Sequence, residues 1–384
     1  MPAAAPPPIP TQTSRHGLRY DFNNGLRLML PQGNWRVDIL DDSSGVLLHT
    51  CRVTGDWVIS PWKYFIPYGI QVTDLNTGTL VLNTALQLSG QSVLVRCSPS
   101  SGLGDLIAWM PVIDAFGKKH GCHMVCSMDH GSARELLQQA WPQIECIGSE
   151  QITHYACYAT YLLGIFEKDA ACYHPIDYKK ISIQQIAKDI LGMDTPELVP
   201  QMGRETKRPL AEKYACIGVQ STGRAKLWNN TSGWAEVVNY LQSHNLRVLC
   251  IDQSAHLDYS GHRNHIPAGA EDWTGNKPLQ ERMALLRHAE VFVGLGSGLS
   301  WLAWACGTPV VLISGFSWPS TEFYTPGRVF NAYVCNGCWN VRGMELSSRF
   351  PDQCAENRQF VCTSSISGKQ VIRKIAALLP DRVQ

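Results

Sequence analysis

The distribution of apolar and polar residues separates an N-terminal stretch from the rest of the chain. Between about residues 20 and 88, short alternating segments such as 36–40 and 57–59 are separated by Asn-Gly, Ser-Gly and Thr-Gly pairs. Alternation with a period of two, interrupted by such turns, is typical of antiparallel hairpins. The pattern therefore predicts a small antiparallel β domain over residues 16–90. The Pro-rich start, residues 1–15, is expected to be disordered.

From about residue 92 the pattern changes to apolar runs that are each followed by a segment with helical spacing. Strand-like runs at 93–97, 122–127 and 144–147 alternate with helical segments such as 133–139. Strands that alternate with helices indicate a parallel sheet with helices on its faces. We therefore predict a first Rossmann-like domain over residues 91–205.

The same alternation begins again after a linker marked by Pro196, Pro200 and Pro209. Strands are expected at 214–220, 247–252, 291–294 and 310–313, with helices at 233–243 and 279–288. This repetition predicts a second Rossmann-like domain over residues 206–330. Apolar residues at helical spacing in 368–379 predict a C-terminal helix within residues 366–384, which would pack across a domain surface, with that of the first domain as one alternative. The expected fold class is α/β.

Composition agrees with several domains and argues against some classes of partner. A chain of 384 residues that is 45% apolar can bury more than one core. With 33 basic and 32 acidic residues, it has no overall field to attract nucleic acid or anionic lipid. The start lacks the features of a secretory signal, and turn residues at 307–309 interrupt the longest apolar stretch. We expect a soluble, cytoplasmic protein without a membrane span.

The first candidate motif follows the strand expected at residues 93–97. It reads Ser-Ser-Gly-Leu-Gly-Asp and ends with Gly104 and Asp105, just before an apolar helical segment. Glycine lets the backbone approach a ligand, and Asp105 would lie at the carboxyl end of the strand, where ligands bind in such sheets. Asp105 could instead serve only to cap the helix.

The second motif, Ser-Thr-Gly-Arg-Ala-Lys from Ser221 to Lys226, directly follows the strand expected to open the second sheet. The hydroxyls of Ser221 and Thr222 and the ammonium group of Lys226 are donors suited to phosphate oxygens. Lys226 could also be an ordinary solvated lysine. Its position after this strand favours the phosphate-binding interpretation.

The third motif is Gly-Ser-Gly-Leu-Ser, from Gly296 to Ser300, between an expected buried strand and a helix. Free amides at a helix start bind anions, and small residues let a pyrophosphate approach the backbone. Alternatively, Gly298 serves only the dihedral angles of a tight turn. Three loops of this kind at strand ends indicate a ligand site more strongly than any one of them alone.

Four of the fourteen cysteines form a separate group. They are Cys335, Cys338, Cys354 and Cys362. A C-x-x-C pair can bind a metal ion from one turn, and two further thiolates complete a tetrahedron. A redox-active C-x-x-C pair is the alternative. Four thiolate ligands leave no open position, so the ion would be structural; the geometry suits zinc and iron equally, with zinc as the physical default.

Together the three loops resemble the ADP-heptose:LPS heptosyltransferases. The similarity lies in a Gly-Asp step after the first strand, Thr222 followed four positions later by Lys226, an aspartate near the end of the next strand, and a late Ser-Gly-Leu-Ser loop. The resemblance implies a GT-B fold and ADP-heptose, a nucleotide sugar, as the donor. The resemblance implies Asp105 as the general base and Asp252 near the ribose. It implies that the phosphates contact Thr222, Lys226, Ser297, Gly298 and Leu299. Gly104, Ser221 and Ser300 in the same loops are further candidates for donor binding.

The chain departs from that family at Gly296, which replaces an acidic residue, and at Trp301, which replaces a histidine. The β domain and the cysteine insert, residues 331–365, resemble instead the autotransporter heptosyltransferases, over nearly the whole chain from about residue 15. This closer resemblance implies transfer to serines of an autotransporter adhesin passenger, one structural iron per chain and a large homo-oligomer.

The implied mechanism is a single displacement. Asp105 removes the proton of the acceptor hydroxyl as its oxygen attacks the anomeric carbon, and Lys226 with the amides of residues 297–300 stabilises the departing ADP. The anomeric carbon is inverted, and no catalytic metal is needed. Two alternatives remain, an LPS-type heptosyltransferase with a sugar acceptor and a nucleic-acid-binding protein with a four-cysteine finger. Near-zero net charge and few basic residues between 335 and 362 argue against the second.

Overall fold

The computed structural model describes residues 7–202, 207–259, 262–341 and 353–379. The chain forms two compact units. Unit 1 contains residues 1–101, 109–178 and 185–196, and unit 2 contains residues 102–108, 179–184 and 197–384. Two helices, α1 (Leu103–His120) and α4 (Ile183–Ile190), contribute residues to both units. Within the described residues, no helix is long and apolar enough to cross a membrane.

Unit 1 is built on a sheet in the order β11-β10-β9-β12-β2-β3-β6. Its parallel part consists of β9 (Ser92–Cys97), β10 (His123–Ser127), β11 (Glu145–Ile147) and β12 (Ala159–Leu163). The helix α2 (Gly131–Ala140) packs on β11. The strands predicted at residues 93–97, 122–127 and 144–147 and the helix at 133–139 are confirmed, whereas β12 was not predicted.

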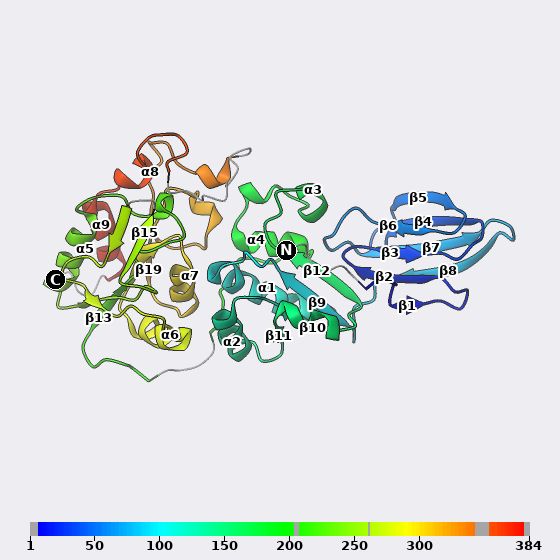
Figure 1. The fold of residues 1–384 in the computed structure, drawn as a ribbon, viewed down its shortest axis with the longest axis horizontal. Helices are drawn as coiled ribbons and strands as arrows, with labels where there is room; N and C mark the ends of the chain where they lie inside the picture. The colour runs from blue at the N-terminus through cyan, green and yellow to red at the C-terminus, as the bar shows by residue number, and fades with distance from the viewer. Residues whose placement is uncertain (1–6, 203–206, 260–261, 342–352, 380–384) are drawn as a thin grey trace. The chain divides into compact units, whose positions relative to one another are not determined.

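The N-terminal strands belong to two different sheets (Figure 1). The strands β1 (Gln12–Thr13), β2 (Arg19–Asn23), β3 (Arg27–Met29) and β6 (Trp57–Ile59) extend the sheet of unit 1, where β2 lies parallel to β12. A separate antiparallel sheet contains β5 (Leu47–Val53), β4 (Trp35–Asp41), β7 (Tyr68–Asp74) and β8 (Thr79–Ala85), in that order. The predicted domain boundary at residue 90 therefore does not coincide with the division between the two sheets.

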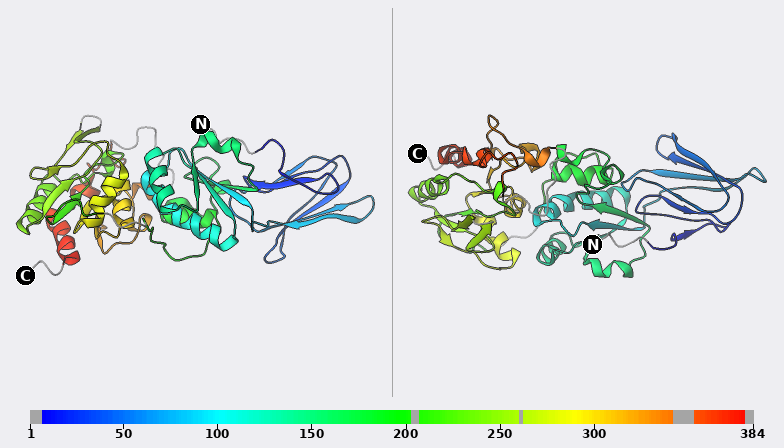
Figure 2. Two further views of the ribbon diagram at one scale, coloured as in Figure 1. Left: turned by 90° about the horizontal axis from the view of Figure 1, so that it is seen from below. Right: turned by 45° about the horizontal axis from the view of Figure 1, so that its top comes forward.

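Unit 2 contains a parallel sheet in the order β17-β14-β13-β18-β19-β20. The strands are β13 (Tyr214–Ile217), β14 (Arg247–Cys250), β17 (Glu271–Asp272), β18 (Phe292–Leu295), β19 (Val310–Ile313) and β20 (Gly327–Val329). Helices cover both faces of this sheet (Figure 2). They are α5 (Gly233–Ser243), α6 (Leu279–His288), α7 (Gly298–Ala305) and α9 (Gly368–Leu378). The expected strands and helices of residues 214–313 are confirmed.

The C-terminal helix α9 begins with a capping box between Ser367 and Gln370. It packs on α5, β19 and β20, and its buried Val371 and Ile375 belong to the core of unit 2. The alternative that this helix covers the first domain is therefore wrong, because its apolar face is used within its own unit.

The remaining elements are short. They comprise the helices α3 (Ala170–Tyr173) and α8 (Val361–Ser364), the hairpin strands β15 (His256–Tyr259) and β16 (His262–His265), and the 3-10 turns η1 (Ser149–His154), η2 (Tyr178–Lys180), η3 (Arg224–Lys226), η4 (Pro319–Thr321) and η5 (Cys338–Asn340). The turn η3 is part of the second motif, and the hairpin of β15 and β16 contacts that motif through Tyr259 and Ser221.

Candidate active site

The first and second motifs meet in unit 2 at Asp105 and Lys226. Both side chains are partly buried, and the charges of the two groups interact. Asp105 lies in the first turn of α1, and its Oδ2 accepts a hydrogen bond of 2.8 Å from the amide of Gly102. The carboxylate therefore caps its helix, as the simpler interpretation proposed, and also lies beside a cation.

Burial and the neighbouring charges act in opposite directions on this pair. Burial raises the pKa of Asp105, while the amide of Gly102 and the charge of Lys226 lower it. Burial lowers the pKa of Lys226, while the carboxylates of Asp105 and Glu322 raise it. A carboxylate with a raised pKa is a stronger base than an ordinary aspartate, which suits proton abstraction.

Asp252 holds the loop after β13 by its carboxylate. It is buried, and its Oδ2 and Oδ1 accept hydrogen bonds from the amides of Val219 at 2.7 Å and Gln220 at 3.3 Å. Burial raises the pKa of Asp252 to about 6, although these bonds oppose the shift. Both oxygens point at the protein backbone, so Asp252 supports the loop that carries Ser221.

The hairpin β15–β16 holds the same loop from another side. The hydroxyl of Tyr259 donates to the carbonyl oxygen of Ser221 at 2.6 Å and accepts from its amide at 3.2 Å. Asn264 donates to the carbonyl oxygen of Val219 at 2.9 Å. The Oγ of Ser221 is buried and has no hydrogen-bond partner among the residues described, whereas Thr222 is exposed. The backbone groups of this loop are thus hydrogen-bonded within the protein, and the hydroxyls of Ser221 and Thr222 are available to a ligand.

The third motif joins β18 to α7. The first amides of a helix, here those of Gly298 and Leu299, have no partner inside the helix, and the side chain of Ser297 does not cap them. These amides are suited to bind an anion. Ser300 instead is fully buried, and its Oγ donates to the carbonyl oxygen of Leu295 at 2.5 Å. The hydroxyl of Ser300 is therefore structural, although its position in the sequence suggested a ligand contact.

Glycines in the first and third motifs allow the two loops to pack closely. A Cβ atom on Gly104 would lie 2.7 Å from Trp301, and a Cβ atom on Gly298 would lie 2.9 Å from Leu103. Trp301 is buried and packs edge-to-face on Phe323, at 4.9 Å between ring centroids. Gly104 is thus needed for the packing of Trp301, a different reason from the close approach to a ligand that the sequence suggested.

Glu322 is a buried carboxylate near Lys226 that the sequence patterns did not single out. It forms an ion pair of 2.6 Å with Arg328 and accepts a hydrogen bond of 2.7 Å from Ser317. A Cβ atom on Gly296 would lie 2.6 Å from its Oε1, so the glycine leaves room for this carboxylate. No periodicity or spacing in the sequence relates residue 322 to residue 296.

The four cysteines of the insert lie near one another. Burial raises the pKa of Cys362 to about 12, and the charges of Cys338, Cys354 and Cys335 add to this shift. Burial likewise raises the pKa of Cys338 to about 11, with further contributions from Cys335 and Cys354. Within the part of the chain that the structure describes, no group of three or more candidate ligands has metal-binding geometry. A tetrathiolate site needs four cysteine ligands, and the insert supplies four.

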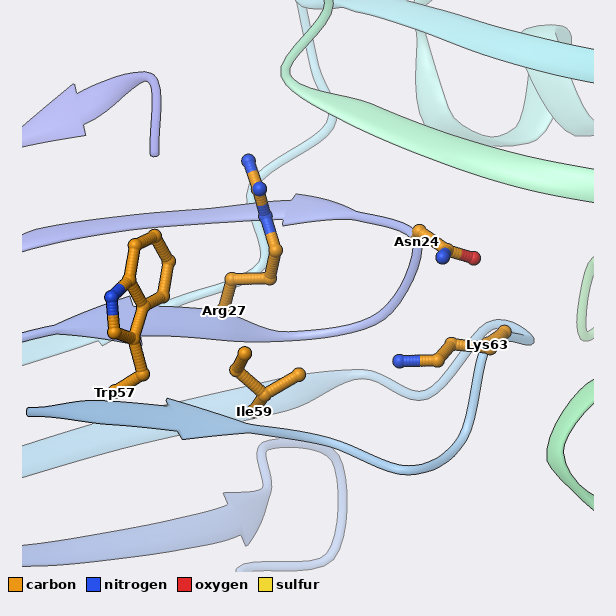
Figure 3. Close-up of a pocket in the computed structure, with 5 residues that line it drawn as sticks. All are labelled: Asn24, Arg27, Trp57, Ile59 and Lys63. Carbon is orange, nitrogen blue, oxygen red and sulfur yellow. The ribbon is translucent and has the colours of Figure 1, made fainter. Parts of the chain in front are cut away.

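A cavity of about 390 Å³ lies in unit 1 (Figure 3). It is lined by Asn24, Arg27, Trp57, Ile59 and Lys63. Arg27 is neutralised by a buried ion pair of 2.6 Å with Asp21, and the Nζ of Lys63 donates to the carbonyl oxygen of Ser60 at 2.8 Å. The lining contains no carboxylate that could serve as a base.

Comparison with known proteins assigns the chain to a family. A model described as the N-terminal domain of glycosyltransferase TibC matches residues 15–76, and one described as glycosyltransferase family 9 (heptosyltransferase) matches residues 166–334. The autotransporter heptosyltransferase Aah of Escherichia coli is 44% identical over 382 residues, covering 98% of this chain and 97% of Aah. The chain belongs to the autotransporter heptosyltransferases. It is therefore a glycosyltransferase that transfers heptose, and the resemblance seen in its sequence is confirmed.

Solved structures agree with this family. The chain matches the iron-containing dodecameric TibC of enterotoxigenic E. coli with a TM-score of 0.91 and 42% identity, covering 98% of this chain and 99% of TibC. A TibC structure in complex with ADP-D-β-D-heptose matches with a TM-score of 0.92 and 42% identity, covering 99% of this chain and all of that one. E. coli ADP-heptose LPS heptosyltransferase II, at 14% identity and a TM-score of 0.54, covering 76% of this chain and 99% of that one, shares the fold alone.

Proposed function

We propose that this autotransporter heptosyltransferase transfers heptose from ADP-heptose to serine hydroxyls of an autotransporter adhesin passenger, with inversion at the anomeric carbon. The observation that carries the proposal is the partly buried pair of Asp105 and Lys226 in unit 2, where the charges of a base and of a diphosphate-binding cation interact. TibC was solved with ADP-D-β-D-heptose, which supports the same donor here. The reaction takes place in the cytoplasm, on a fold of the GT-B type.

Asp105 acts as the general base in this proposal. Its raised pKa makes it a better proton acceptor, and the acceptor oxygen attacks the anomeric carbon as the proton leaves. One displacement inverts the configuration of that carbon. Lys226 stabilises the negative charge that develops on the departing ADP, because a cation in a site of low dielectric stabilises developing charge strongly.

The donor phosphates are bound by side chains of the second motif and by amides of the third. The hydroxyl of Ser221, which has no partner in the described part of the chain, the exposed hydroxyl of Thr222 and the ammonium group of Lys226 supply the first set. The amides of Gly298 and Leu299 supply the second. Asp252 acts through the loop that it supports, since both of its oxygens accept from backbone amides.

We further propose that Cys335, Cys338, Cys354 and Cys362 hold one structural iron ion, with zinc as the alternative. The four thiols interact with one another, and TibC is an iron-containing dodecamer, which supports both a metal site and a large homo-oligomer for this chain. A closed thiolate site would stabilise the fold of the insert and take no part in the chemical step.

The direct test is co-expression of this protein with an autotransporter passenger, followed by intact mass measurement of the passenger. The expected result is a series of heptose-sized mass increments, located on serines by peptide fragmentation. Co-expression with an Asp105→Asn variant is the matched control and should give a passenger with far fewer increments. An unmodified passenger with the wild-type enzyme, together with a modified lipopolysaccharide core, would assign a sugar acceptor instead.

Replacing Lys226 with alanine is expected to weaken ADP-heptose binding and to slow the departure of ADP. The loss should be larger in kcat than in donor affinity, because the charge on the diphosphate grows towards the transition state. Steady-state kinetics and calorimetric titration with ADP measure the two effects. If both donor affinity and rate stay at the wild-type values, Lys226 has no role in the site.

Replacing Tyr259 with phenylalanine is expected to raise the KM for the donor with a smaller change in kcat. The variant keeps the buried ring but loses the hydroxyl that bonds both the amide and the carbonyl oxygen of Ser221. Asp258→Asn, which breaks the exposed ion pair of the same hairpin, is the control. It should change neither the KM for the donor nor kcat. Equal kinetics for both variants would show that the hairpin does not position the loop.

A further inference from the structure

The segment around the fourth cysteine packs against the phosphate-binding loop of the second motif. Phe360, Ala225 and Phe316 form one buried apolar cluster, and Cys338, Trp339 and Cys354 pack against it. Ala225 lies between the two cations of the turn η3. The four-cysteine segment and the loop proposed to bind the donor phosphates thus share a core.

Both cations of this loop lie over aromatic rings of the cluster. The guanidinium carbon of Arg224 lies 5.0 Å from the centre of the Phe360 ring, and the Nζ of Lys226 lies 6.0 Å from that of Phe316. The Nε of Arg224 is buried without a hydrogen-bond partner among the described residues. The face of an aromatic ring attracts a cation, so the ring of Phe360 helps to fix the orientation of Arg224.

Hydrogen bonds join the end of the loop to the helix that Phe360 precedes, α8. Asn229 donates to the Oγ1 of Thr363 at 3.0 Å, and Asn230 donates to the carbonyl oxygen of Ser364 at 3.0 Å. Residues 229 and 230 lie only a few positions beyond Lys226, so a shift of α8 would move the loop.

The backbone of Phe360 is in the left-handed region, with a φ of 55°, and Gln359 and Asn357 have φ values of 49° and 52°. This region is costly for a large side chain such as phenylalanine. Such a conformation persists only where the surroundings fix it. At Phe360, the burial of the ring beside Ala225 and Arg224 offsets the cost of this backbone conformation. The strained segment therefore holds the Phe360 ring in this position.

We propose that Phe360 is a positioning residue for the donor-phosphate loop, through which the four-cysteine segment controls donor affinity. The inference rests on the proposed function, since it assumes that the loop from Ser221 to Lys226 binds the diphosphate. The ring acts on the donor only through Arg224 and Ala225. It is expected to affect donor binding more than the chemical step.

The test compares Phe360→Leu with Tyr333→Ala in full-length protein. Leucine keeps an apolar side chain but lacks the ring face beneath Arg224, while Tyr333 lies in the same insert and is 99% exposed. We expect Phe360→Leu to raise the dissociation constant of ADP and the KM for the donor by roughly tenfold, with little change in kcat, and Tyr333→Ala to change neither. Metal content per chain should equal that of the wild type in both.

A merely structural role for Phe360 would reduce the active fraction, and therefore kcat, without moving KM or the affinity for ADP. A second variant, Thr363→Val, removes the acceptor of Asn229 with little change in volume and should raise the dissociation constant in the same direction; it decides the question if Phe360→Leu does not fold. Wild-type ADP affinity in the folded variants overturns the inference. Failure of the wild-type protein itself to bind ADP would instead refute the proposed donor site.

Discussion

Replacing Asp105 with asparagine is expected to slow heptose transfer by about 10²- to 10⁴-fold, the usual contribution of a general base, while leaving donor binding intact. The amide oxygen of asparagine can still accept the hydrogen bond from Gly102, so the helix cap and the fold should persist. Single-turnover kinetics with saturating donor and calorimetric titration with ADP separate the two effects. Turnover close to that of the wild type would remove Asp105 from the mechanism.

The pKa of the Asp105 carboxylate predicts how the rate depends on pH. The base works only when it is ionised, so the rate should fall as the pH drops through the pKa of Asp105. Because burial raises that pKa, the fall should occur at a higher pH than for an ordinary aspartate. The charge of Lys226 lowers the pKa, so Lys226→Ala should move the acidic limb of kcat/KM further upward. An acidic limb that does not move in Lys226→Ala would contradict the electrostatic coupling of the pair.

Replacing any one of the four cysteines by serine is expected to abolish metal binding and to give insoluble or disassembled protein. Binding to a closed thiolate site contributes directly to the free energy of folding, because the unfolded chain has no such site. All four variants should behave alike, since each ligand completes the same tetrahedron. Elemental analysis of the wild-type protein should find about one iron or zinc ion per chain.

Replacing Cys216 by alanine is the matched control for these variants. Cys216 is fully buried in strand β13, and burial raises the pKa of its thiol, so it behaves as a small apolar core residue. Its loss should cost only about 1 to 3 kcal/mol of stability and leave the metal content unchanged. A wild-type preparation that is folded and active without any metal would contradict the proposed site.

The sequence by itself determined the family and four strands of the second sheet, but not its edge strands β17 and β20. The strands at β13, β14, β18 and β19 are short apolar runs between helical segments, and such patterns are local, so they can be recognised without coordinates. It also singled out Asp105 and Lys226 separately, because each lies in a loop after a strand, at the end of the sheet where ligands bind. The charges of these residues do interact in the structure.

Only the tertiary structure decided which neighbours those elements have. The pairing of β2 with β12, the packing of Trp301 on Gly104, the support of Ser221 by Tyr259 and the contact of Phe360 with Arg224 join residues far apart in the chain. None of them leaves a periodic signal in the sequence. Such contacts depend on side-chain volume and direction within one packed core, where each residue fits only because the others are already placed.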